Sequence, residues 1–150
     1  MAKERIYVLL MSNVPLAIAM IVENDNTDGD FFGFLYHEYH REVYRLSLKI
    51  VGNSLDAEDV TQTTFLKIYK SIEKFRDLPP MEIAPLIVVY SRNAAKDFMR
   101  KKRRHVILLR YRYGLSEKET ADAMSMSETA VSSCLLRAKK TLRKKMGGKL

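Results

Sequence analysis

Cysteine, glycine and proline are all scarce in this sequence of 150 residues. The single cysteine, Cys134, excludes a disulfide framework and any metal site built from several cysteines, and it points to a reducing compartment. Six glycines and four prolines are too few for the many tight turns of a β-barrel or β-sandwich. A glycine-rich phosphate-binding loop is also missing from the sequence. These shortages argue against a β-rich, a disulfide-rich or a nucleotide-binding fold.

Acidic residues are outnumbered, since 26 Lys and Arg against 18 Asp and Glu give a net charge of +8. Residues 86–112 hold nine basic residues and one acid, residues 135–150 hold seven basic residues and no acid, whereas residues 1–30 are mildly acidic. Two separate basic blocks predict two places where a nucleic-acid backbone docks. Taken alone, each block is equally typical of a basic helix face that is exposed to solvent and contacts no nucleic acid.

A mostly apolar stretch near the N-terminus, residues 6–22, superficially resembles a signal peptide. It is shorter than the roughly 20 residues that span a bilayer, and Ser12, Asn13 and Pro15 interrupt it. We interpret residues 1–30 as a leader, which is either a helix or strand packed on the first domain or a poorly ordered segment. We expect no stable membrane insertion.

Helical periodicity dominates the rest of the chain. Apolar residues recur at three- and four-residue steps from Phe32 to Ile50, and Gly52-Asn53 closes this predicted helix. A second helix follows over residues 56–72, with either Ser54 or Asp56 as its N-cap. The pattern thus predicts two helices joined by a short turn.

Prolines mark the next segment. Pro79, Pro80 and Pro85 predict an irregular loop over residues 75–85, with a third helix that starts near Leu86. Neither glycine nor proline lies between Leu86 and Tyr113, so this stretch is expected to form one continuous helix of about 27 residues, roughly 40 Å long.

The C-terminal third carries a sharper pattern. Ser116 and Glu119 form a predicted capping box, and a short helix follows through Met124. Ser125-Met126 is then a turn, and Ser127 caps a final basic helix. The apolar face of that helix comprises Val131, Leu135, Ala138 and Leu142. Two capped helices joined by a tight turn predict a helix-turn-helix.

Catalytic constellations are weak. His37 and His40 lie one helical turn apart but lack a third metal ligand at a sensible spacing, which favours two exposed helix histidines. Cys134 has no histidine near it in the sequence that could activate it as a nucleophile. We therefore predict a binding protein that is not an enzyme and that needs no metal or other cofactor.

Three segments carry a resemblance to a known family. Residues 56–66, DAEDVTQTTFL, resemble the pattern DAEDxxQxxFL, and residues 91–100, SRNAAKDFMR, resemble ARNxxxDxxR. Residues 108–116 and 127–142 are similar to the helix-turn-helix that follows these motifs. Over residues 31–146 the chain thus resembles the extracytoplasmic-function (ECF) sigma factors of the bacterial sigma-seventy superfamily.

The resemblance implies an all-α fold with two small helical domains. Residues 31–104 would bind RNA polymerase and read the minus-ten element, and residues 105–150 would form the DNA-binding helix-turn-helix, with an unusually short or absent linker between them. Polymerase-binding residues are then Asp56, Asp59 and Gln62. Phe75 or Tyr90 is a candidate platform for a splayed base, although either aromatic can also belong to the core.

Candidate DNA-binding residues follow from the same resemblance. For the minus-ten element they are Arg76, Arg92, Asn93, Lys96, Arg100, Arg103 and Arg104. For the minus-thirty-five element they are Thr129, Ala130, Ser132 and Ser133 at base edges, with Arg137 and Lys140 on phosphates.

The sequence also departs from the family pattern at several positions. Cys134 stands where the family usually has arginine, Ser125 where it has glycine, and Thr120 where it has an aliphatic residue. In the first domain, Ala84-Pro85 replaces a threonine–tryptophan pair and Thr63 replaces a common glutamate. All three second-domain departures fall in the helix-turn-helix, and the linker is short, so we expect the minus-thirty-five element to be read poorly or not at all.

The sequence is best interpreted as a cytoplasmic sigma factor. Its expected partners are the RNA polymerase core and promoter DNA, with an anti-sigma factor as a further candidate. The first alternative is a stand-alone helix-turn-helix regulator that binds duplex DNA without polymerase. A second alternative is an interaction module with a decayed DNA-reading domain, which explains the departures but not the sustained basic charge.

Overall fold

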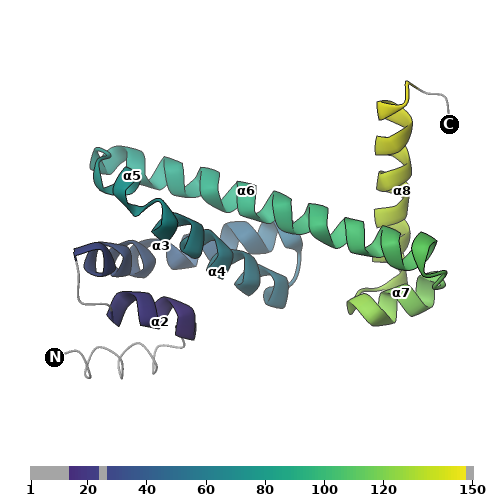
Figure 1. The fold of residues 1–150 in the computed structure, drawn as a ribbon, viewed down its shortest axis with the longest axis horizontal. Coiled ribbons are helices and arrows are strands. Elements are labelled where there is room, and N and C mark those ends of the chain that lie inside the picture. The colour runs from purple at the N-terminus through teal and green to yellow at the C-terminus, as the bar shows by residue number, and fades with distance from the viewer. Residues whose placement is uncertain (1–13, 24–26, 148–150) are drawn as a thin grey trace. The chain divides into compact units, whose positions relative to one another are not determined.

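The computed structural model describes residues 14–23 and 27–147 (Figure 1). These residues form seven α-helices and one π-helical turn and include no β-strand, which confirms the predicted all-α class. In chain order the elements are α2 (Leu16–Glu23), α3 (Thr27–Val51), α4 (Ser54–Lys70), α5 (Ile72–Arg76), α6 (Pro80–Ile107), η1 (Leu108–Arg112), α7 (Glu117–Met124) and α8 (Glu128–Lys145). The chain forms two compact units that divide between Lys96 and Asp97, within α6.

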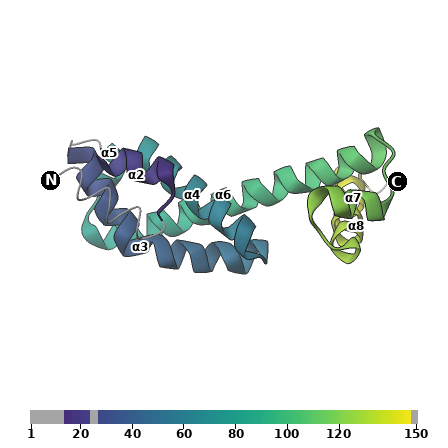
Figure 2. The same cartoon turned by 90° about the horizontal axis from the view of Figure 1, so that it is seen from below.

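The first unit has an aromatic and aliphatic core. Phe32 of α3 meets Phe65 of α4 edge to face, with their ring centroids 6.3 Å apart, and both side chains are fully buried. Helices α3 and α4 pack along each other, as both views show (Figures 1 and 2). Burying a phenylalanine or leucine side chain of this kind contributes about 1.5–3 kcal/mol. The core therefore fixes which face of α4 points outward.

Helix α2, which precedes α3 in the chain, packs onto this core. Ile18 and Ala19 are buried, and α2 contacts both α3 and α4. Val22 lies so close to Gly33 that a Cβ added there would come within 3.2 Å of the valine Cγ1. Of the alternatives for the leader, residues 16–23 thus adopt the packed helix, whereas residues 6–13 lie outside the described residues.

The turn between α3 and α4 is built by Gly52 and Asn53. Gly52 has a left-handed φ of +87°, which glycine adopts without steric cost. The Asn53 side chain then accepts a hydrogen bond from the Asp56 amide at 2.9 Å. Asn53 is therefore the N-cap, and the prediction of Ser54 or Asp56 in that role was wrong because α4 begins earlier, at Ser54 itself.

The loop predicted over residues 75–85 was also wrong. Residues 72–76 form α5, and α6 begins at Pro80, so only residues 77–79 are irregular. Pro80 fits the first helical position, where no amide donor is needed and its fixed φ suits the helix. Pro85 lies inside α6 on an exposed side, while Ile83 and Ile87 on the same helix are buried and hold the segment in place.

Helix α6 continues without an irregular residue into η1, so the chain is helical from Pro80 to Arg112. The π-helical turn closes with a hydrogen bond from the Tyr113 amide to the Leu108 carbonyl at 3.1 Å. Gly114, with a φ of +70°, follows directly. The helix predicted from Leu86 is thus present but begins earlier than expected.

The second unit contains the predicted helix-turn-helix. The Glu119 amide donates to Ser116 Oγ at 3.0 Å and the Ser116 amide donates to Glu119 Oε2 at 2.7 Å, which confirms the capping box. Ser127 caps α8 through the Ala130 amide at 3.1 Å. The core of this unit comprises Val106, Ala121, Val131 and Leu135.

The turn between α7 and α8 departs from ideal chemistry. Ser125 has a φ of +52°, in the left-handed region where glycine is favoured. A residue with a side chain costs about 1–2 kcal/mol more in this conformation.

None of the helices within the described ranges is sufficiently long and apolar to cross a bilayer.

Candidate functional site

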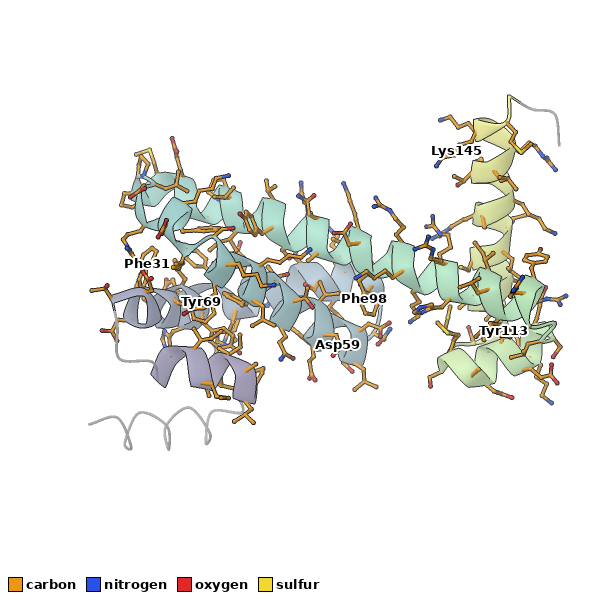
Figure 3. The ribbon with its side chains drawn as sticks, in the orientation of Figure 1. Phe31, Asp59, Tyr69, Phe98, Tyr113 and Lys145 are labelled. Carbon is orange, nitrogen blue, oxygen red and sulfur yellow. The ribbon has the colours of Figure 1, made fainter. Side chains whose placement is uncertain are left out.

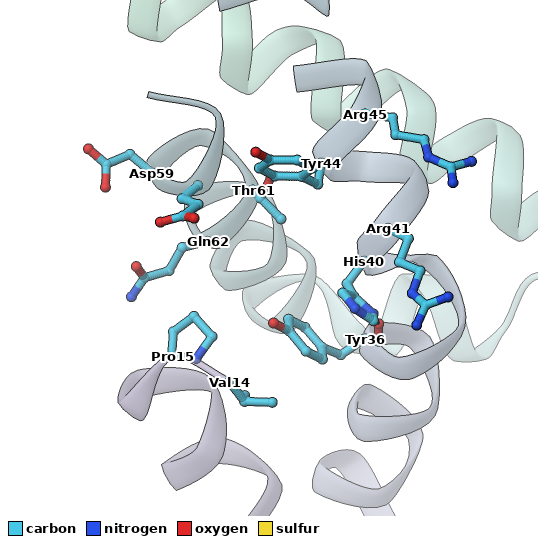
Figure 4. Close-up of a pocket in the computed structure, with 11 residues that line it drawn as sticks. Val14, Pro15, Tyr36, His40, Arg41, Tyr44, Arg45, Asp59, Thr61 and Gln62 are labelled. Atoms are coloured by element: carbon cyan, nitrogen blue, oxygen red, sulfur yellow. The ribbon is translucent and has the colours of Figure 1, made fainter. Parts of the chain in front are cut away.

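A groove opens on the first unit between α2, α3 and α4, with a volume of about 610 Å³ (Figure 4). Its walls come from the start of α2, the middle of α3 and the first turns of α4. The lining residues are Val14, Pro15, Tyr36, His40, Arg41, Tyr44, Arg45, Glu58, Asp59, Thr61 and Gln62. Its lining combines polar and apolar residues, which suits a protein segment better than a purely apolar ligand.

The α4 wall carries two of the three residues that the sequence singled out for polymerase. Asp59 is exposed on the outer side of α4 (Figure 3), and Gln62 is half-buried one turn further on. Phe65 and Ile68 on the same helix are fully buried. The structure thus brings Asp59 and Gln62 together at the groove.

Asp56, the third residue of that set, does not line the groove. Its carboxylate accepts a hydrogen bond from Asn53 Nδ2 at 2.8 Å, and its amide is held by the Asn53 side chain. Asp56 therefore belongs to the cap that starts α4, one turn before the groove residues.

The α3 wall was not found from the sequence. Tyr36 and His40 stack with their ring centroids 5.1 Å apart and their planes 9° from parallel. His40 Nδ1 donates to the Tyr36 carbonyl at 3.0 Å, which fixes this stack along the α3 wall of the groove. Burial raises the pKa of the Tyr36 hydroxyl above its ordinary value. The signal that could have revealed this wall is the i, i+4 spacing of Tyr36 and His40.

The two long rims of the groove carry opposite charge. Arg41 and Arg45 stand on the α3 rim, while Glu58 and Asp59 stand on the α4 rim. The Asp59 carboxylate and the guanidinium groups of Arg41 and Arg45 point away from one another (Figure 4). A segment seated between them meets a positive field on one side and a negative field on the other.

The candidate minus-ten residues are spread over α5 and α6. Arg92, Asn93 and Lys96 are exposed in the first unit, and Arg100 and Arg104 are exposed in the second. Arg100 Nη1 lies 3.5 Å from Asp97 Oδ1, an exposed pair that contributes little to stability. These side chains leave α6 with an outward basic surface in each unit.

Two of the candidates near α5 have structural contacts. The Arg76 guanidinium pairs with the Asp28 carboxylate at the start of α3. Phe75 is fully buried and meets the half-buried Tyr90 edge to face, with ring centroids 5.2 Å apart. Phe75 therefore offers no exposed face on which a base could stack, and its interpretation as a platform was wrong because it fills the core.

Arg103 differs from its neighbour Arg104. It lines an apolar groove of about 610 Å³ within the second unit, together with Ile107, Tyr111 and the C-terminal half of α8. Burial raises the pKa of the Cys134 thiol, and Arg103 and Arg137 only partly offset this effect. Cys134 is a half-buried free thiol at one of the positions where the sequence departs from the family pattern.

The residues predicted on α8 fall on more than one side of the helix. Thr129, Ser133, Arg137 and Lys140 are exposed, whereas Val131 and Leu135 are buried against the rest of the unit. Ala130 is half-buried, and the Ser132 hydroxyl donates to the Glu117 carboxylate of α7. The exposed side of α8 thus presents two hydroxyls and two cations, while Ser132 joins the two helices.

Comparison with known proteins identifies the family of this chain. The Sigma-70 region 2 model matches residues 35–105, and the Sigma-70 region 4 model matches residues 99–142. The ECF RNA polymerase sigma factor BldN of Streptomyces coelicolor is 25% identical over an alignment 159 positions long, which covers 77% of this chain and 60% of BldN. The ECF RNA polymerase sigma factor SigE of Mycolicibacterium smegmatis is 38% identical over 42 residues, which cover 28% of this chain and 16% of SigE.

A solved structure of the RsbN–BldN complex is similar over 85% of this chain and 97% of the matched chain, with 28% identity and a TM-score of 0.42. The chain spans less than two thirds of the length of the SigE and BldN sequences. Region 2 and region 4 are matched in family order and together cover more than two thirds of the residues. The chain therefore belongs to the sigma-70 family and is of the ECF type.

Proposed function

We propose that this protein is a sigma factor that binds the RNA polymerase core and directs promoter-specific initiation of transcription. The observation that carries the proposal is the pair of exposed Asp59 and half-buried Gln62, which the folded region 2 presents at the rim of a groove. The protein acts by binding in the cytoplasm and is not an enzyme. An anti-sigma protein that blocks these surfaces is a further partner that the family resemblance supports.

Two DNA surfaces complete the proposal. Arg92, Asn93, Lys96 and Arg100 on α6 would contact the melted minus-ten strand, whose backbone attracts exposed cations. The exposed side of α8 would enter the major groove at the minus-thirty-five element, with Thr129 and Ser133 at base edges. A stand-alone regulator needs only the second surface, and neither the region 2 match nor the groove has a role in it.

Core binding tests the assignment of the groove. The double variant Asp59→Ala/Gln62→Ala should weaken affinity for polymerase core by roughly 1–3 kcal/mol, because a charged and a polar interface contact are lost. Thr63→Ala is the matched control, since Thr63 is exposed on the same helix but does not line the groove. Titration by fluorescence anisotropy measures both, and circular dichroism verifies that helicity is retained.

Two outcomes would contradict the proposal. Unaltered core affinity in the double variant would show that this face does not bind polymerase. Tight, sequence-specific binding to duplex promoter DNA without any core association would instead favour the stand-alone regulator.

A further inference from the structure

Helix α2 lies beside the proposed polymerase site but outside the recognised family region. The region 2 match begins at residue 35, whereas α2 covers Leu16–Glu23. Val14 and Pro15, which lead into this helix, nevertheless line the same groove as Asp59 and Gln62. Figure 4 shows Val14 and Pro15 at the end of the groove, facing Tyr36 and Gln62.

The position of this end wall is fixed by packing. Ile18 and Ala19 are buried in the first unit, and Val22 fits against Gly33, where no side chain is in the way. The Pro15 carbonyl accepts the first helical hydrogen bond, from the Ala19 amide at 3.0 Å. Pro15 is thus the N-cap residue of α2. Because Ile18 and Ala19 bury the next turn of this helix in the core, the position of the wall is fixed.

We propose that Val14 and Pro15 form part of the docking surface for the polymerase core, so that this chain binds core with a wall that region 2 alone does not supply. The inference rests on the proposed function. Its occupant is the same core segment that contacts Asp59 and Gln62, because the end wall and the α4 rim line one continuous groove. A helix with its side chains is about 10–12 Å across, so one that is seated against Gln62 also covers the adjoining wall.

The chemistry of the wall complements that of the rims. Val14 and Pro15 are apolar and half-buried, whereas the long rims carry Arg41 and Arg45 on one side and Glu58 and Asp59 on the other. An amphipathic segment with an apolar residue at its end and opposite charges on its flanks fits this groove. The apolar contact adds affinity, while the charged rims set the direction in which the segment lies.

The variant Val14→Ser/Pro15→Ser removes the apolar wall and keeps an N-cap residue for α2, at the cost of the contact that Val14 makes with the core of the first unit. Serine is among the preferred N-cap residues, so it retains the start of the helix that Pro15 now provides. Met20→Ser is the matched control, because Met20 is 63% exposed on the same helix and does not line the groove. The single variant Pro15→Ser serves as a milder test should the double variant unfold.

Affinity of the full chain for polymerase core is measured by anisotropy titration. The wall variant should raise the dissociation constant about five-fold, as expected for losing a small apolar contact, and Met20→Ser should leave it unchanged. Combining Pro15→Ser with Gln62→Ala should give an effect that is not the sum of the two, because both residues would touch one partner segment.

The failure of this inference differs from the failure of the proposed function. If Asp59→Ala/Gln62→Ala weakens core binding but the wall variant does not, α2 is not part of the surface and the function stands. If neither variant weakens binding, the assignment of the groove itself fails. If the wall variant instead shifts a monomer–dimer equilibrium in sedimentation velocity, the occupant is a second copy of this chain and the inference is overturned.

Discussion

Asn53 and Asp56 form a reciprocal pair at the start of α4. The Asp56 amide donates to Asn53 Oδ1 at 2.9 Å, while Asn53 Nδ2 donates to the Asp56 carboxylate at 2.8 Å. The pair begins the helix whose next turns present Asp59 and Gln62 to the groove. Of three residues that one motif places together, the first thus shapes the helix and the other two stand at the site.

Removing this cap should affect stability more than binding. Asn53→Ala should lower the free energy of unfolding by about 1 kcal/mol, the usual cost of losing an N-cap side chain. Asp56→Ala should also destabilise the protein, whereas Asp59→Ala, on an exposed part of α4, should change stability by less than about 0.5 kcal/mol. Urea denaturation followed by circular dichroism measures all three. Equal stabilities for Asp56→Ala and the unmodified chain would return Asp56 to a purely binding role.

Phe75 should behave as a core residue. Phe75→Ala should cost about 3–5 kcal/mol of unfolding free energy, because it opens a cavity beside Tyr90. Phe75→Leu retains most of the buried volume, so it should fold and should bind a single-stranded minus-ten oligonucleotide like the unmodified chain. A Phe75→Leu protein that folds normally but loses the oligonucleotide would restore the role of base platform.

Local chemistry explains why some elements could be predicted from the sequence. Each helix cap of the second unit joins residues only three positions apart in the sequence. The capping box of Ser116 and Glu119 and the cap at Ser127 both form the hydrogen bonds that their patterns imply. The inward spacing of Phe65 and Ile68 likewise defines the outer face of α4. Such features depend on contacts between residues a few positions apart.

Features set by packing between distant segments could not be predicted. Pro85 reads as a helix breaker, yet the burial of Ile83 and Ile87 outweighs the one hydrogen bond that proline removes. The sequence predicts a loop that includes Phe75, because no local pattern shows that the packing of α5 and α6 buries this side chain. The end wall at Pro15 meets Gln62 only after α2 packs on α3 and α4, so no local pattern indicates it.

Reversing the charge of the α3 rim of the groove should weaken the binding of polymerase core. Arg41→Glu/Arg45→Glu places acids on both rims, so a core segment with an acidic flank should bind at least ten-fold more weakly at low salt. The difference should shrink at higher ionic strength, because salt screens exposed charges. Lys49→Glu is the control, since Lys49 is exposed further along α3 and does not line the groove. An equal loss in both variants would indicate a general charge effect.

Salt dependence separates the basic residues that contact DNA from those that do not. Neutralising Arg104, which is exposed, should reduce the slope of log K against log salt by about 0.9 for a duplex contact, and by less on a single strand. Arg103 lines the apolar groove of its unit and lies near Cys134, so Arg103→Gln should change the slope less. Unchanged slopes for both variants would show that this basic run is a solvated face.

The junction between the two matched regions should limit promoter reading. The family resemblance implies a flexible linker of a few tens of residues, yet this chain is helical from Pro80 to Arg112. A helix of the 27 or so residues after Leu86 spans roughly 40 Å, whereas promoter elements more than two duplex turns apart are separated by about 80 Å.

We therefore expect polymerase that carries this chain to protect the minus-ten element strongly and the minus-thirty-five element weakly in a footprint. Inserting 25 glycine and serine residues after Arg100 should add protection at the minus-thirty-five element, because the inserted chain extends the reach of α8. That gain should disappear when Arg137 and Lys140, both exposed on α8, are changed to alanine. Equal protection of both elements without the insertion, dependent on residues 127–140, would refute the expectation.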